Sequence, residues 1–150
     1  HGAAASPFAA AVQGKTYLCE ENPMGITRFS LEFGEDGAAC FHYWNAQGEQ
    51  RLEFGMQRNL YGKFPQRGYS DEYGNVHELT DFRYDCAASA GWIEPQKLQL
   101  QVQIIDRYFG GLTITFGFVD ETLVGVRMVK AAEDFLDEYE GWMTGHLSGD

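Results

Sequence analysis

Residues 97–105 alternate polar and apolar side chains almost without interruption. The apolar positions are Leu98, Leu100, Val102 and Ile104, and the polar positions between them are Lys97, Gln99, Gln101 and Gln103. Successive side chains of a β-strand point to opposite faces, so this segment is predicted to be a strand with one buried and one solvated face. Strands of this kind are typical of antiparallel sheets.

Segments with the same alternation recur along most of the chain. The predicted strands cover residues 15–20, 26–33, 38–44, 49–56, 82–89, 97–106, 112–119 and 122–130. Turn residues separate them, and Glu35-Asp36-Gly37 is a strong hairpin pattern because glycine readily adopts the positive φ of a tight turn. Short strands joined mostly by sequential hairpins predict an all-β fold, roughly an eight-stranded antiparallel up-and-down barrel.

The periodicity changes near the C-terminus, over residues 131–140. Apolar side chains recur there at spacings of three and four, and the set comprises Phe135, Leu136 and Tyr139 and is extended past this segment by Trp142 and Met143. This spacing predicts an amphipathic helix that packs against the sheet. Gly141 is expected to be the residue that caps and ends it.

The chain is predicted to hold one domain. A chain of 150 residues buries roughly 70% of the surface that its unfolded form exposes, which is enough for one core and scarcely enough for two. Residues 14–150 are therefore assigned to a single barrel domain with a C-terminal helix. The Ala-rich start, residues 1–13, is interpreted as a linker or a cloning remnant.

The predicted inward face of the barrel carries bulky side chains. They are Phe29, Leu31, Phe33, Leu52, Phe54, Leu98, Leu100, Ile114, Phe116, Phe118, Val124, Val126 and Met128. A closed barrel of eight strands can fill its interior with side chains or hold one small ligand. The size of these residues favours a packed interior over a roomy one.

The chain is strongly acidic, with a formal net charge of −11 and a pI of about 4.7. Such a charge repels phosphate backbones and anionic membranes, so neither nucleic acid nor a membrane is an expected partner. No apolar run approaches the roughly 20 residues of a membrane-spanning helix. The three cysteines are widely spaced and are predicted to be buried free thiols, which fits a cytoplasmic location.

No recognised catalytic or metal-binding motif occurs in the sequence. The Gly-x-Ser-x-Gly and His-Glu-x-x-His patterns are absent, and no serine has a lysine three residues later. Tyr43-Trp44-Asn45 fits the Tyr-x-Asn element of serine acyl-enzymes but has no nucleophile to serve, and His42 and His77 are isolated. The chain alone is predicted to have no catalytic residue, metal or cofactor, while acid–base pairs among its many carboxylates stay open because only geometry identifies them.

Five segments of the chain form a distinctive set: Gly14-Lys15-Thr16-Tyr17, Phe82-Arg83-Tyr84, Ala87-Ala88-Ser89-Ala90 with Trp92, Leu112-Thr113-Ile114-Thr115-Phe116-Gly117-Phe118, and Ala132-Glu133-Asp134-Phe135-Leu136-Asp137-Glu138-Tyr139-Glu140-Gly141. In these segments the sequence resembles the C-terminal accessory domain attached to class C β-lactamase-like serine hydrolases of the penicillin-binding protein and D-aminopeptidase type. The resemblance implies a lipocalin-like barrel and an upstream catalytic domain that holds the Ser-x-x-Lys nucleophile. It transfers no catalytic residue to this chain.

The periodicity lapses between residues 57 and 81, which predicts a long structured loop. Within it, Phe64, Arg67, Tyr69 and Tyr73 are the candidate contacts with the upstream hydrolase domain or with a ligand, because aromatic and arginine side chains dominate binding interfaces. The alternative is that this loop folds back over one mouth of its own barrel.

Three functions are consistent with the sequence. The first is a non-catalytic accessory barrel that packs on a serine hydrolase domain and shapes access to its cleft. The alternative is a stand-alone lipocalin-like binder of a small apolar ligand, and the third is a barrel enzyme that uses carboxylates. An apolar cavity would favour the binder, whereas a filled barrel with an exposed aromatic patch would favour the accessory domain.

Overall fold

The computed structural model describes residues 3–34, 36–70, 78–105, 109–131 and 139–148, with the backbone alone for residues 66–70, 78–83 and 109. This part of the chain forms ten strands and one short helix. The strands are β1 (Thr16–Cys19), β2 (Arg28–Phe33), β3 (Ala38–Asn45), β4 (Gly48–Met56), β5 (Leu60–Ser70), β6 (Glu78–Glu94), β7 (Lys97–Ile105), β8 (Phe109–Asp120), β9 (Leu123–Ala131) and β10 (Gly141–Leu147), and the helix is α1 (Phe8–Val12).

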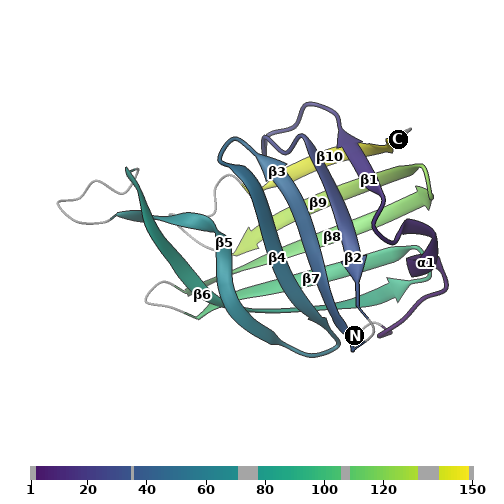
Figure 1. The fold of residues 1–150 in the computed structure, drawn as a ribbon, viewed down its shortest axis with the longest axis horizontal. Helices are drawn as coiled ribbons and strands as arrows, with labels where there is room; N and C mark the ends of the chain where they lie inside the picture. Colours follow the sequence, from purple (N-terminus) through teal and green to yellow (C-terminus); the bar gives the residue numbers. More distant parts are fainter. Residues whose placement is uncertain (1–2, 35, 71–77, 106–108, 132–138, 149–150) are drawn as a thin grey trace.

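The strands close into a barrel (Figure 1). Their order is β4-β3-β2-β1-β10-β9-β8-β7-β6-β5, and every pairing along this order is antiparallel. β4 also pairs in parallel with β6, through Gly55 opposite Ser89 and Met56 opposite Ala90. This contact closes a ring of nine strands and leaves β5 outside the ring.

The closing contact requires a glycine at position 55. A Cβ atom there would overlap the backbone oxygen of Arg58 and would lie 2.8 Å from the Cγ of the same residue. The following residues bond tightly to two other segments, because the Met56 N–H donates to the Gly37 carbonyl at 2.8 Å and the Gln57 N–H donates to the Ala90 carbonyl at 2.7 Å. The chain therefore turns sharply from β4 into β5 while it stays bonded to β6.

The prediction of an all-β barrel is confirmed, but the ring has nine strands and not eight. Each predicted strand corresponds to an observed one, whereas β5 and β10 are additional. The prediction of a long loop over residues 57–81 is wrong for residues 60–70 and 78–81, which lie in β5 and β6. The alternation is hidden there because Gly62, Pro65 and Gly68 interrupt it, and the β5–β6 register shifts twice between Lys63 and Tyr69.

Most of the predicted C-terminal helix, residues 132–138, lies outside the described residues. Gly141 opens β10 at a φ of +138° and does not cap a helix, and a Cβ atom there would lie 2.5 Å from the Cγ of Pro23. Trp142 is 65% exposed, whereas Met143 is 4% exposed. Adjacent residues with opposite exposure are a strand pattern, so the extension of the helical stripe to these two residues is wrong.

The barrel interior is a continuous hydrophobic core. All the residues predicted to point inward are buried except Phe33, which is half-buried. Aromatic rings meet across the interior, with centroid distances of 5.6 Å between Phe29 and Phe116 and 5.2 Å between Phe41 and Phe116. Ring pairs at these separations attract one another beyond their burial of apolar area. The prediction of a packed interior is confirmed for these residues.

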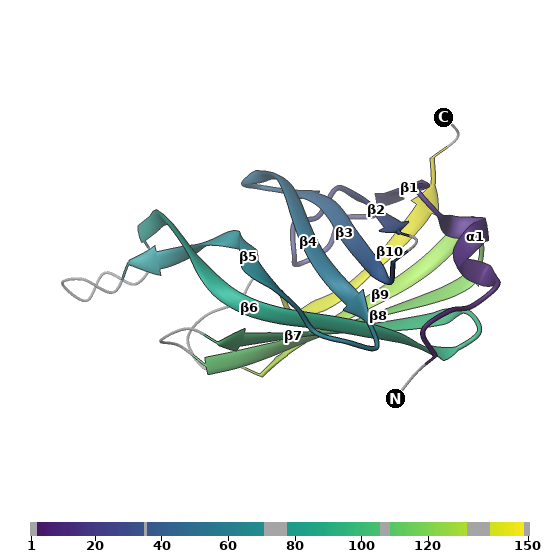
Figure 2. The ribbon, with the colours of Figure 1, turned by 60° about the horizontal axis from the view of Figure 1, so that its bottom comes forward.

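Residues 3–13, interpreted from the sequence as a linker, contact the barrel. The backbones of Ala3 and Trp92 exchange two hydrogen bonds of 2.8 Å. The ring of Phe8, in α1, lies 5.3 Å from that of Phe118. Figure 2 shows α1 against one end of the barrel. This segment therefore adds apolar contacts at that end.

Candidate functional site

Two tyrosine hydroxyls are buried together in the barrel. The Oη atoms of Tyr43 and Tyr139 lie 2.7 Å apart, and the two residues are 1% and 2% exposed. Their rings meet edge to face at 6.2 Å. Phe64, from β5, adds a second edge-to-face contact at 5.3 Å from the Tyr139 ring. Aromatic rings thus enclose the hydroxyl pair and connect β3, β5 and the residue two positions before β10.

The residues of the Tyr43-Trp44-Asn45 pattern face different environments. The Tyr43 hydroxyl lies in the interior beside Tyr139. Trp44 lies on the outer wall, where the Arg28 guanidinium sits 4.2 Å from its ring centroid. The Asn45 Oδ1 accepts a hydrogen bond of 3.0 Å from the backbone N–H of Gln47, in the β3–β4 turn. These side chains do not form one site.

The four predicted contact residues do not share one surface among the described residues. Phe64 is 1% exposed and packs on Tyr139, so its side chain belongs to the core of its own barrel. Arg67 and Tyr69 lie in β5, where the backbone is described. Tyr73 lies outside the described residues. The contact role of Arg67, Tyr69 and Tyr73 stays a prediction.

The outer half of the β5–β6 hairpin extends beyond the barrel rim (Figures 1 and 2). We call residues 67–70 and 78–83 the β5–β6 arm. Its strands pair with each other, with Arg67 opposite Arg83 and Ser70 opposite Glu78. The pairing of β6 with β7 begins only at Cys86. In the described part of the chain the arm is therefore a two-stranded ribbon that no third strand supports.

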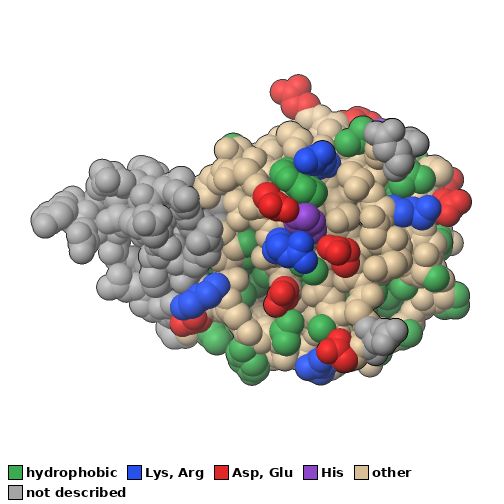
Figure 3. Space-filling model, viewed as in Figure 1, with side chains coloured by type: hydrophobic (Ala, Val, Ile, Leu, Met, Phe, Trp, Pro, Cys, Tyr) green, Lys and Arg blue, Asp and Glu red, His purple; other side chains and the backbone are tan. Residues whose placement is uncertain are grey.

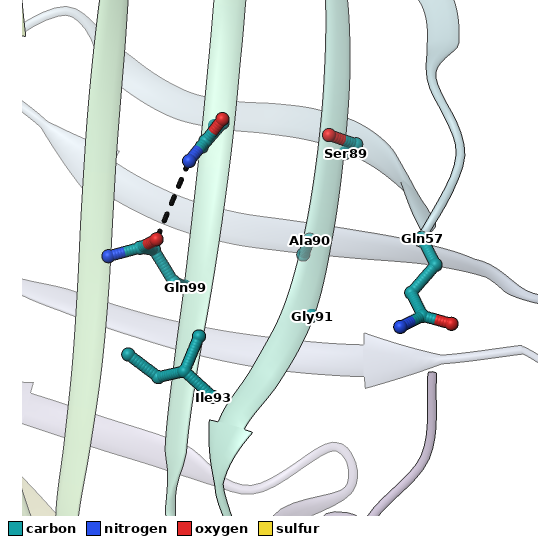
Figure 4. A pocket seen from close by; sticks show the side chains of 7 residues that line it. Gln57, Ser89, Ala90, Gly91, Ile93 and Gln99 are labelled. Carbon is teal, nitrogen blue, oxygen red and sulfur yellow. Dashed lines mark hydrogen bonds between the residues drawn. The ribbon is translucent and has the colours of Figure 1, made fainter. Parts of the chain in front are cut away.

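A groove of about 400 Å³ opens on the outer wall beside the β4–β6 contact (Figure 4). Its lining consists of Gln57, Ser89, Ala90, Gly91, Ile93, Gln99 and Gln101. The register explains the grouping, because Ser89 of β6 pairs with Gln101 of β7 and Gly91 pairs with Gln99. Three primary amides and one hydroxyl thus meet in a hollow whose lining has no charged side chain. Each amide can donate and accept hydrogen bonds.

The backbone of Gln57 is unusual. Its φ is +56°, and no other described residue apart from glycine has a positive φ. This left-handed conformation costs a residue with a Cβ roughly 1 kcal/mol, and such residues are found disproportionately at functional sites. Figure 4 shows Gln57 and Gln99 on opposite sides of the strand that carries Ala90 and Gly91. The strained conformation therefore presents an amide at one edge of the groove.

Sequence reasoning assigned no role to the groove residues. It placed Gln99 and Gln101 on the solvated face of a strand, and that placement is confirmed by their position on the outer wall. The available signal was glutamine at three successive outward positions of one strand, with Gln103 as the third. The positive φ of Gln57 has no signature in the sequence.

The opposite outer face, formed by β2, β3 and β4, is charged (Figure 3). The Nε2 atom of His42 lies 2.5 Å from Oε2 of Glu49, and Nη2 of Arg51 lies 3.8 Å from Oε1 of Glu32. Ser30 is opposite His42 in the β2–β3 register, but no hydrogen bond joins these two described side chains. His42 and Arg51 thus face carboxylates of other strands, and among the described side chains no base is hydrogen-bonded to Ser30.

The described residues contain no group of three or more His, Cys, Asp and Glu side chains that could hold a metal ion. The three cysteines are free, and Cys40 and Cys86 are buried, as predicted, whereas Cys19 is half-buried. Burial raises the pKa of the Cys19 thiol to about 12, and burial together with the charge of Asp85 raises the pKa of Cys86 to about 11. Thiols with raised pKa values are poor nucleophiles at neutral pH.

No known protein-family model matches this chain, and a search of curated proteins finds no match. Among the described residues, no helix has the length and apolar character needed to cross a membrane. Function is therefore inferred from geometry and residue chemistry alone.

Proposed function

We propose that this chain is a non-catalytic accessory barrel that docks on a serine hydrolase domain of the same polypeptide through the β5–β6 arm and shapes access to its cleft. The observation that carries the proposal is the arm itself. An isolated two-stranded ribbon is marginally stable in water, and an unpaired strand edge invites pairing or cover. A ribbon that leaves the barrel rim with no third strand beside it among the described residues is therefore suited to lie against a neighbouring domain.

The filled interior supports an accessory role over ligand storage. The inward positions of the ring carry contacting aromatic and aliphatic side chains, and the amide-lined groove lies on the outer wall. The only buried polar or charged residues in the described part of the chain are Ser30 and Gln50, so no carboxylate is available there for acid–base catalysis inside the barrel. The stand-alone binder of a small apolar ligand is the alternative that these features disfavour.

The test uses the full polypeptide that carries this chain, with the arm shortened. Residues 68–82 are replaced by Asn-Gly, because Arg67 pairs with Arg83 and a two-residue turn can join an antiparallel pair. The pairing of β6 with β7 is untouched, since it begins at Cys86. We expect the barrel to keep its Tm within about 4 °C while kcat/KM of the hydrolase and the association of the domains both change.

The control lengthens a different hairpin. Gly-Ser inserted between Ala46 and Gln47 alters the β3–β4 turn, and this variant should leave the kinetics and the domain association unchanged. The isolated chain should not turn over ester, amide or β-lactam substrates. Unchanged kinetics in the shortened-arm variant would contradict the proposal, as would an upstream reading frame without Ser-x-x-Lys and Tyr-x-Asn.

A further inference from the structure

The middle of the outer face of β7, β8, β9 and β10 carries no carboxylate. Along these strands the outward positions that alternate with buried ones are neither Asp nor Glu among the described residues, and Asp120 lies exposed at the very end of β8. The chain has 22 acidic residues, so their absence from these outward positions distinguishes this face from the charged face of β2–β4. The outward cations are Lys97 and Arg127. The other outward positions are mostly occupied by residues with amide, hydroxyl or small apolar side chains and by glycine.

One row of side chains crosses this face from strand to strand. Gln99 pairs with Thr115, Thr115 with Arg127, and Arg127 with Trp142, so β7 to β10 each contribute one residue in direct register. The Gln99 Nε2 donates to the Thr115 Oγ1 at 3.4 Å, and the Arg127 guanidinium lies 5.4 Å from the Trp142 ring centroid. Trp142 is 65% exposed, which leaves one indole face available to a ligand. Neighbouring strands are about 4.8 Å apart, so the row spans about 14 Å.

The amide-lined groove continues this row. Gln99 belongs to both, because it lines the groove and begins the row. Gln101 donates from Nε2 to the Gln99 Oε1 at 3.4 Å, which is a long bond that a ligand can replace at small cost. On the far side of the groove is the amide of Gln57, held there by its left-handed backbone. Groove and row together form a path from the β4–β6 contact to β10.

We propose that this path binds an extended, uncharged polysaccharide chain. Sugar hydroxyls both donate and accept hydrogen bonds, and the amides of Gln57, Gln99 and Gln101 do the same. The indole of Trp142 offers a flat apolar surface to the C–H face of a pyranose ring. The path residues include no carboxylate and a single cation, Arg127, which matches a ligand without charge. This site is separate from the β5–β6 arm, and the two proposals can fail independently.

Two other kinds of partner fit the face less well. A nucleic acid would need a cluster of Lys and Arg to neutralise phosphates, whereas the outward positions of these strands offer Lys97 and Arg127. A protein interface is built around a buried centre of apolar and aromatic residues. Here the centre of the path is glutamine and threonine, and the exposed indole lies at one end.

The test is native affinity electrophoresis of the purified chain in gels that contain hydroxyethylcellulose, glucomannan or xylan. The chain migrates to the anode because its formal charge is −11, and a neutral polymer fixed in the gel retards it only by binding. We expect retardation by at least one of these polymers. Trp142→Ala should lower the association constant about tenfold, as loss of a large aromatic contact typically does.

Gln57→Gly separates binding from folding. Glycine adopts a positive φ without strain, so this variant should keep its Tm within about 4 °C of the parent chain and still lose affinity with the amide. The control is Trp44→Ala, which removes an aromatic side chain from the outer wall of β3, on the charged face opposite the path, and should leave retardation unchanged.

Three results would overturn the proposal. One is migration unaffected by all three polymers. Another is retardation that Trp142→Ala and Gln57→Gly leave intact. The last is a chain that no polymer retards but that self-associates in sedimentation experiments, with the self-association abolished by Trp142→Ala. This result would assign the face to a second copy of the chain.

Discussion

Replacement of Phe64 by alanine should destabilise the barrel, although the sequence suggested an exposed contact residue. The side chain is 1% exposed, and its ring lies edge-on to Tyr139 at 5.3 Å. Removal of a core phenylalanine costs about 3 to 5 kcal/mol, and the lost ring pair is part of that cost. β5 is the strand outside the ring, so it can partly collapse onto the cavity that the missing ring leaves. We therefore expect the free energy of unfolding to fall by about 3 kcal/mol, at the lower end of this range.

The assay is urea unfolding followed by tryptophan fluorescence, with Tyr61→Ala as the matched variant. Tyr61 lies on the same strand and is 70% exposed, so its loss should change the free energy of unfolding by no more than about 0.5 kcal/mol. With an m-value of about 1 to 3 kcal/mol/M, Phe64→Ala should lower the urea midpoint by about 1 to 2 M. Equal midpoints for the two variants would refute the placement of Phe64 in the core and return it to the set of contact residues.

Two further predictions concern stability. Gly55→Ala should lower the free energy of unfolding by about 2 kcal/mol, because its Cβ would overlap the Arg58 carbonyl at the barrel closure. Gly62→Ala, which has open space around it, should be nearly neutral. Equal urea midpoints for the two variants would contradict this prediction. The folded state raises the pKa of the Cys86 thiol from its ordinary value of 9.0 to about 11, so between these two pH values the folded chain holds a proton that the unfolded chain releases. The free energy of unfolding should therefore fall as the pH rises from 9.0 towards 11. Below pH 9.0 the ionisation of this thiol should not affect it. Urea midpoints at about pH 8 and pH 10 measure the slope, which Cys86→Ala should reduce; a midpoint that rises over this range would refute the sign.

The strands that could be predicted from the sequence are those in which buried and exposed side chains alternate strictly. In β7, Leu98, Leu100, Val102 and Ile104 are buried and the residues between them face outward, as the sequence alone indicates. β5 could not be predicted in the same way, because Pro65 and two glycines break the alternation. Proline is tolerated there because β5 is an edge strand, where one missing backbone donor need not interrupt a ladder.

β10 shows how two periodicities can be confused. Tyr139, Trp142 and Met143 are spaced by three and four, which suits one face of a helix as well as scattered positions of a strand. Their exposure resolves the ambiguity, since Trp142 and Met143 point to opposite sides of the barrel wall. This information comes from the pairing of β10 with β1 and β9, and β1 is separated from β10 by more than 100 residues of chain.

The candidate sites depend on contacts that sequence order does not contain. The groove requires Gln57 to meet Ser89 and Gln101 through the parallel contact between β4 and β6. A parallel pair that closes an otherwise antiparallel barrel has no local signature. The row that ends at Trp142 likewise depends on the register of four strands.

Titration of the purified chain with N-phenyl-1-naphthylamine, a neutral apolar probe whose emission rises on burial, tests most directly the claim that the barrel is filled and binds through its outer surface. The core rings that meet across the interior, such as Phe41 and Phe116 at 5.2 Å, leave little room for the probe, so we expect no saturable rise in emission. A saturable rise with one probe bound per chain, reversed by a competing fatty acid, would contradict it and identify the barrel as the holder of a small apolar ligand.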